Sequence, residues 1–171
     1  MILMIYIPAI GEDKVISFEV QVICLENNNK EEVLVTGNID NVIVEGISII
    51  ISLLKQKNID TRKYIHIHYP DYSFNREGSS AMLGTFISVY LSLAKKNIKH
   101  KIIASGELDI YGNIVGVRGV DKKYNYYKLN NYSYFFIPKS NYNCLFDNNV
   151  LAFSNIDEVI KTLKEMSINE L

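Results

Sequence analysis

The sequence predicts a single α+β domain in which mixed sheets with hairpins pack against about four helices. Short runs rich in β-branched and aromatic residues mix with helical runs, without the strict strand–helix alternation of a doubly wound parallel sheet. Several of these runs follow one another closely, which favours hairpins. No internal repeat and no linker interrupts the 171 residues, so we expect one domain over residues 1–171.

The first half of the chain predicts strands around one long helix. Residues 1–11 are apolar and rich in Ile, which favours a strand. Residues 14–25 predict a second strand, and after a polar turn residues 33–37 return as its hairpin partner. Apolar residues at i, i+3 and i+4 spacing predict an amphipathic helix over residues 41–59. The alternation of isoleucines with histidines predicts a strand at residues 64–70.

The second half predicts three helices and four strands. The helices are expected at 80–96, at 121–129 and at 156–166, the last capped by Asn155 or Ser154. The strands are expected as a pair within 101–119, joined through 109–112, and as two single strands at 134–138 and 150–154, with a polar loop near 140–149.

Composition excludes a strongly charged binding surface over the whole chain. Eighteen Lys and Arg stand against 19 Asp and Glu, a formal charge of −1, so no global basic field favours nucleic acid or anionic lipid. Cys24 and Cys144 form neither a metal-spaced pair nor a disulfide framework. Residues 1–11 lack the charged lead and cleavage site of a signal peptide, and no apolar run is long enough to span a membrane. We therefore expect a cytoplasmic protein without membrane association.

Few residues suggest a cofactor or a metal. No Gly-x-x-x-x-Gly-Lys-Ser/Thr loop and no Gly-x-Gly-x-x-Gly follows a strand. His66 and His68, two apart on a strand, face the same side, but a metal site needs a third and a fourth ligand. Two histidines hydrogen-bonded to their neighbours are the simpler interpretation, so we expect no metal and no cofactor.

The stretch "NREGSSAMLG" places Ser80 at the start of a predicted helix. Unpaired backbone N–H groups and the positive end of the helix dipole lie there. Such a serine caps its helix in most proteins, and in a few it attacks a carbonyl whose oxyanion those N–H groups stabilise.

A nucleophilic serine needs a base, and "GVRGVDKK" offers Lys122 and Lys123 at another helix start. A lysine acts as a base near neutral pH only if burial lowers its pKa, which costs roughly 4 kcal/mol. A pair of solvated surface lysines is the alternative interpretation.

Three segments together resemble the proteolytic domain of Lon proteases, a family that uses a Ser-Lys dyad. They are "IHIHYPDYSFNREGSSAMLG", "ASGELDIYGNIVGVRGVDKK" and "FFIPKSN". The resemblance extends upstream through "VLVTGNIDNVIVEGISI", with Glu45 at an acidic family position, and downstream to "NVLAF". It is strongest over residues 14–166.

The resemblance implies a role for several residues. Ser80 would be the nucleophile and Lys123 the general base, with Ser105 hydrogen-bonding the lysine amine. The backbone N–H groups near Gly78 and Ser80 would hold the oxyanion. Glu77 would adjust or block the groove.

His68 would help to arrange the same groove. Three positions depart from the family pattern. Ser79 replaces a common proline or aspartate, Met82 replaces a small residue and could narrow the groove, and Arg118 replaces a glycine near the lysine. The cation of Arg118 could lower the lysine pKa further or disturb its placement.

The implied activity is that of a serine endopeptidase which cuts unfolded polypeptides or peptides. The family couples this domain to an ATP-driven ring that the present sequence lacks, so we expect an excised domain, an ATP-independent peptidase, or a separate unfoldase (ATPase) partner. Family members form six-membered rings, which implies a homo-hexamer. The cleavage-site preference is not readable from the sequence.

Two other functions stay open. A catalytically weak or inactive Lon-like module could bind peptide or scaffold a partner, which Met82 and Arg118 favour. Binding of single-stranded nucleic acid would use a set of tyrosines as stacking platforms, but interleaved asparagines and the near-neutral charge favour core packing instead. These tyrosines are Tyr126, Tyr127, Tyr132 and Tyr134.

Overall fold

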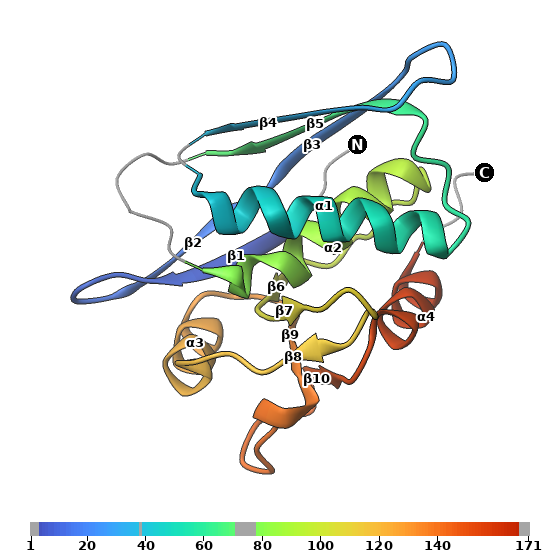
Figure 1. The fold of residues 1–171 in the computed structure, drawn as a ribbon. Coiled ribbons are helices and arrows are strands. Elements are labelled where there is room, and N and C mark those ends of the chain that lie inside the picture. Colours follow the sequence, from blue (N-terminus) through green and yellow to red (C-terminus); the bar gives the residue numbers. More distant parts are fainter. Residues whose placement is uncertain (1–3, 38, 71–77, 168–171) are drawn as a thin grey trace.

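A computed structural model describes residues 4–37, 39–70 and 78–167 (Figure 1). The strands are β1 (Ile5–Ile10), β2 (Val15–Glu19), β3 (Gln21–Glu26), β4 (Glu32–Gly37), β5 (Lys63–Tyr69), β6 (Ile102–Ala104), β7 (Glu107–Leu108), β8 (Ile114–Val115), β9 (Tyr134–Pro138) and β10 (Val150–Phe153). The helices are α1 (Asn41–Gln56), α2 (Met82–Leu93), α3 (Val120–Leu129) and α4 (Ile156–Met166), with short 3-10 turns η1 (Ser79–Ala81) and η2 (Lys139–Asn141). The predicted α+β class with four helices is confirmed.

The larger sheet has five strands in the order β10-β9-β6-β1-β2. The first four run parallel to one another, and β2 pairs with β1 in antiparallel fashion. Phe135, Phe136 and Ile137 of β9 are fully buried, as expected for a central parallel strand covered on both faces.

The smaller sheet has the order β3-β5-β4, and it corrects one prediction. The hairpin expected between residues 14–25 and 33–37 is wrong, because β5 lies between β3 and β4 and pairs with both. The run 14–25 is also divided. It leaves the large sheet as β2 and enters the small sheet as β3, with the buried Val20 at the junction.

Helices α1 and α2 lie under the small sheet (Figure 1), and both contribute many buried residues to the main hydrophobic core. Asp40 caps α1 by accepting a 3.0 Å hydrogen bond from the backbone N–H of Ile43. The buried face of α1 recurs at helical spacing and includes Ile43, Ile47 and Ile50. Helix α2 is buried on nearly all sides, which explains its small and apolar composition.

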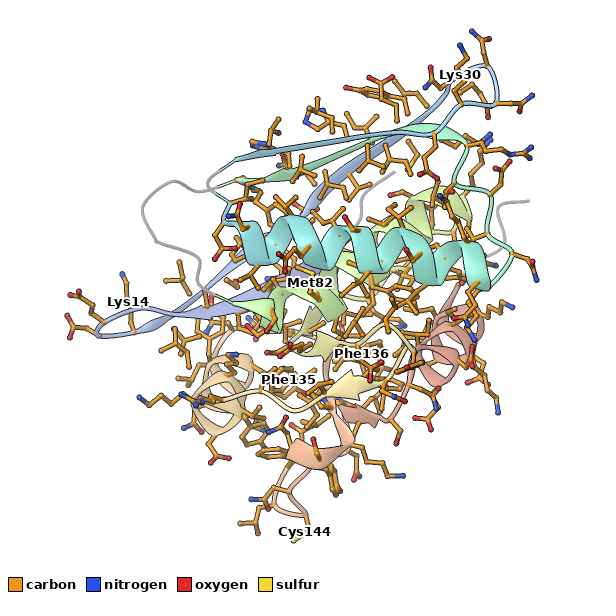
Figure 2. All side chains as sticks on the ribbon, in the orientation of Figure 1. Lys14, Lys30, Met82, Phe135, Phe136 and Cys144 are labelled. Carbon is orange, nitrogen blue, oxygen red and sulfur yellow. The ribbon has the colours of Figure 1, made fainter. Side chains whose placement is uncertain are left out.

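Gly46 of α1 and Met82 of α2 form a close helix–helix contact. A β-carbon at Gly46 would overlap the Met82 sulfur, so the thioether occupies the space that the glycine leaves open. Figure 2 shows Met82 against α1. The packing of α1 on α2 therefore depends on this pair.

The remaining local predictions largely agree with the structure. Strands β7 and β8 form the expected hairpin, and Asp109 closes its turn by accepting 2.9 Å bonds from the backbone N–H groups of Tyr111 and Asn113. Asn155 caps α4 by accepting a bond from the Glu158 N–H.

Among the tyrosines of residues 124–134, Tyr127 is buried and the others are half-buried against the fold. Tyr127 stacks on Phe135, and the hydroxyls of Tyr126 and Tyr132 both contact Ser17 Oγ. No described helix has the length and apolar character that crossing a membrane requires.

Candidate active site

Ser80 lies in the 3-10 turn that leads into α2, and its side chain is half-buried. The turn begins at Gly78, whose φ of +128° is a backbone conformation that favours glycine. Two hydrogen bonds of 3.0 Å fix the turn: Gly106 N–H donates to the Ser80 carbonyl, and Leu83 N–H donates to the Gly106 carbonyl. The start of α2 is thereby held against the segment that follows β6.

Lys123 lies in the first turns of α3, and its side chain is only 4% exposed. Burial lowers the pKa of its amine from the usual 10.5 to about 8. Burial is the cause of this shift, so the expected contribution from Arg118 is not needed. The neighbouring Lys122 is exposed, so the solvated interpretation holds for that lysine and fails for Lys123.

Ser105 connects Lys123 of α3 to the large sheet. It is fully buried after β6, and its backbone N–H donates a 3.0 Å bond to the Phe136 carbonyl of β9. The Lys123 Nζ donates a 3.0 Å hydrogen bond to Ser105 Oγ, the contact that the resemblance implied. A buried amine thus has a neutral hydroxyl as its partner and no carboxylate within the described residues, which favours its uncharged form.

Ser80 and Lys123 line one cavity of about 400 Å³. Gly78 lines the cavity next to Ser80. The side chains of Glu107 and Arg118 also line it and bring one negative and one positive charge. The apolar part of the lining comes from β1, β2 and α1: Ile7, Pro8, Ala9, Ile10, Phe18 and Ile43.

Ser80 Oγ and Lys123 Nζ share this cavity without a hydrogen bond between them; among the described residues the amine bonds Ser105 instead. A neutral amine that donates one N–H to Ser105 keeps its lone pair for a second partner. Catalytic hydrogen bonds of this kind often form only when substrate is bound.

Other predicted site residues lie elsewhere. Glu77 falls outside the described residues. The ring nitrogens of His68 and His66 lie 2.7 and 2.8 Å from the Thr36 hydroxyl, and neither histidine lines the cavity. Met82 does not line it either, because its side chain points at Gly46, so it does not narrow the groove as expected.

Asn141 is a residue whose part sequence reasoning missed. Its side-chain amide donates a 2.9 Å bond to the Val117 carbonyl and accepts a 2.9 Å bond from the Val117 N–H. Val117 belongs to the cavity wall between β8 and α3. The only sequence signal was the position of Asn141 within "FFIPKSN", one of the segments that carry the resemblance.

The described residues contain no group of three or more His, Cys, Asp or Glu side chains that could hold a metal ion. The cavity does contain a hydroxyl, a buried amine and the backbone N–H groups at the start of a helix, which have no partner within that helix. These groups suit nucleophilic attack on a carbonyl.

Comparison with known proteins agrees with this chemistry. Residues 8–165 match the model of the family described as the Lon protease (S16) C-terminal proteolytic domain. A Lon protease of Clostridioides difficile (strain 630) is 32% identical over 116 residues, which cover 63% of this chain and 14% of the relative. The chain therefore spans only a small part of such relatives.

Two further Lon proteases give the same picture. One from Mesomycoplasma hyopneumoniae (strain 232) is 28% identical over 123 residues, 68% of this chain and 14% of the relative. One from Aster yellows witches'-broom phytoplasma (strain AYWB) is 25% identical over 146 residues, 76% of this chain and 18% of the relative.

Proposed function

This chain belongs to the family of Lon protease C-terminal proteolytic domains, and we propose that it is a serine endopeptidase with a Ser80–Lys123 dyad. The observation that carries this proposal is the buried amine of Lys123. Its pKa of about 8 lets a useful fraction act as a base near neutral pH, in the cavity that Ser80 also lines.

The reaction follows from the groups present. Ser80 Oγ attacks the scissile carbonyl carbon while its proton passes to the neutral Lys123 amine. Backbone N–H groups near Gly78 and Ser80 hold the oxyanion. The protonated amine then gives its proton to the leaving nitrogen, and the peptide bond breaks to leave an ester on Ser80. Water, deprotonated by the same amine, hydrolyses the ester and restores Ser80.

An extended peptide is the substrate form that suits the cavity. Strand β1 pairs with β2 along its length, but in the described part of the chain it pairs with β6 only at Ile5 and Tyr6. The range Ile7–Ile10 therefore presents an edge without a partner strand, and these residues line the cavity. A free edge binds an extended backbone by strand addition.

The direction in which the backbone groups of β1 point follows from its antiparallel pairing with β2. Gly11 N–H donates a 2.8 Å bond to the Lys14 carbonyl, and bonding residues alternate along an antiparallel pair. Pro8 and Ile10 consequently point their backbone groups away from β2, which agrees with the missing N–H of proline. The carbonyl of Pro8 and both backbone groups of Ile10 are then available to a substrate.

We also propose that the domain acts without ATP on unfolded polypeptides or peptides, in the cytoplasm. No nucleotide-binding loop occurs in these 171 residues and none of the steps above uses a nucleotide, so ATP would be needed only to unfold a folded substrate, which we propose an unfoldase partner does. Assembly into a homo-hexamer is a further proposal that family membership supports.

The first test is cleavage of unfolded casein and of a small peptide library without nucleotide. Ser80→Ala and Lys123→Ala are each expected to lower cleavage by about 1,000-fold or more. Two controls remove the same groups from exposed positions outside the cavity: Ser48→Ala on α1 and Lys122→Ala beside the dyad. Cleavage that survives Ser80→Ala would refute the dyad.

The alternative is a peptide-binding or scaffolding module of the same family. The absence of a Ser80–Lys123 hydrogen bond among the described residues is the observation that favours it. If wild type forms an oligomer and binds peptide but cuts nothing, this function replaces the enzyme. Binding that is unchanged in Ser80→Ala would accompany that result.

A further inference from the structure

We propose that Arg118 binds a carboxylate of the substrate and makes this cavity select peptides with an acidic group next to an apolar residue. The proposal concerns the same cavity and rests on the proposed function for its physiological meaning. Its ligand class, an anionic peptide, follows from four features of the cavity wall.

The first feature is an unused charge. Arg118 lines the cavity, and it forms no ion pair or hydrogen bond with any residue that the structure describes. A guanidinium is permanently cationic and presents a planar fork of donors that matches a carboxylate. A peptide carboxylate would therefore meet a donor set that no described group occupies.

The second feature is a fixed backbone on both sides of Arg118. Before it, Val117 is held by the two 2.9 Å bonds from the Asn141 amide. After it, Gly119 has a left-handed φ of +72° and packs so closely on Ile10 that a side chain would overlap it. Because both neighbours of Arg118 are held, its backbone is anchored at the cavity wall and its guanidinium stays within side-chain reach of that point.

The third feature is the apolar side of the cavity. Ile10, Phe18 and Ile43 line the same cavity as Ser80 and Lys123 and provide a surface for an apolar side chain. Burial of such a side chain stabilises binding by roughly 1.5–3 kcal/mol. An ion pair at the exposed Arg118 would add less, so it selects among apolar peptides and does not replace that contact.

The fourth feature is the opposite charge of Glu107. This residue also lines the cavity, and it forms no ion pair with Arg118. A substrate carboxylate is repelled by Glu107 and attracted by Arg118, so the two charges together favour its placement at Arg118. Removal of Glu107 should consequently strengthen the preference for an acidic peptide. Removal of Arg118 should abolish that preference.

The test measures binding to the Ser80→Ala protein, so that cleavage does not interfere. Three labelled peptides share an apolar residue. The first carries Glu beside it and has an amidated C-terminus, the second replaces Glu by Gln, and the third is the Gln peptide with a free C-terminal carboxylate. The first is expected to bind about 3- to 10-fold more tightly than the second, as for a partly exposed ion pair. If the Gln peptide with a free C-terminal carboxylate also binds tightly, Arg118 accepts the carboxylate of a peptide C-terminus as well as that of a side chain.

Arg118→Gln in the same background should bring the Glu/Gln ratio to about 1, and Glu107→Gln should raise it. Lys161→Gln, which removes an exposed cation from α4 outside the cavity, should leave it unchanged. Higher salt should lower the ratio. A ratio of 1 in the parent protein, or an unchanged ratio in Arg118→Gln, would overturn the inference. Selective binding without cleavage by wild type would refute only the peptidase, and cleavage without selectivity would refute only the role of Arg118.

Discussion

Replacement of Lys123 by methionine is expected to stabilise the fold while it abolishes cleavage. Methionine keeps an unbranched chain of similar length and removes the charge from a site that is 4% exposed. The native pKa of about 8, against the usual 10.5, measures how strongly this site disfavours the ammonium. At about 1.36 kcal/mol for each pKa unit, the cost is about 3 kcal/mol.

A lost hydrogen bond opposes this gain. Ser105 is fully buried, and its hydroxyl loses the 3.0 Å bond from the amine when Lys123 becomes methionine. Such a loss costs about 1 kcal/mol. The cost of the buried charge is the larger quantity, so Lys123→Met should raise the free energy of unfolding by about 2 kcal/mol at pH 7.

The gain must depend on pH in a defined direction. The native amine loses its proton near pH 8 and the unfolded amine near pH 10.5, so the unfolded state binds more protons between these values. Wild-type stability therefore rises with pH across that window. The advantage of Lys123→Met should be complete below about pH 8 and should disappear by about pH 10.5.

The assay is urea unfolding of wild type and Lys123→Met between pH 7 and 10.5. Lys122→Met is the matched control, because Lys122 is exposed and adjacent, and its effect should stay within about 0.5 kcal/mol at every pH. A Lys123→Met protein that is less stable than wild type at pH 7 would refute the reasoning. A stability difference that does not change with pH would do the same.

Three further predictions concern neighbouring contacts. Ser105→Ala should lower kcat/KM by about 10-fold or more by releasing the amine that Ser105 holds, whereas Ser105→Thr keeps the hydroxyl and most of the rate in a peptide-cleavage assay. Gly46→Ala should lower the free energy of unfolding by about 1–3 kcal/mol, because the new β-carbon overlaps Met82. In a double-mutant cycle, Gly46→Ala should cost much less when Met82 is already alanine. Asn141→Ala should weaken peptide binding by loosening the wall that carries Arg118, and equal peptide affinities in wild type and variant would contradict that role.

Much of the local structure could be predicted from the sequence. Apolar spacing predicted α1, and the Asn155 cap predicted the start of α4, because helix periodicity and capping arise from residues within one or two turns. The candidate residues Ser80 and Lys123 came from the same kind of signal, a polar residue at a helix start, together with the family resemblance.

Strand pairing could not be read in this way. The segments that became β3 and β4 are joined by a short polar turn, which is typical of a hairpin, yet β5 separates them. Every second residue of β5 is buried, and these buried side chains belong to the same hydrophobic core as α1 and α2. A pairing partner tens of residues away leaves no local pattern.

The distinction between Lys122 and Lys123 shows most clearly what only tertiary structure decided. The two are adjacent and chemically identical, and the family resemblance alone favoured the second. In the fold, α3 turns Lys123 toward Ser105 and the interior, while Lys122 stays in solvent. Desolvation depends on every element that surrounds a group, so the lowered pKa of Lys123 is a property of the packed domain. The sequence by itself determined which residues could react, and long-range packing determined which of them is tuned to do so.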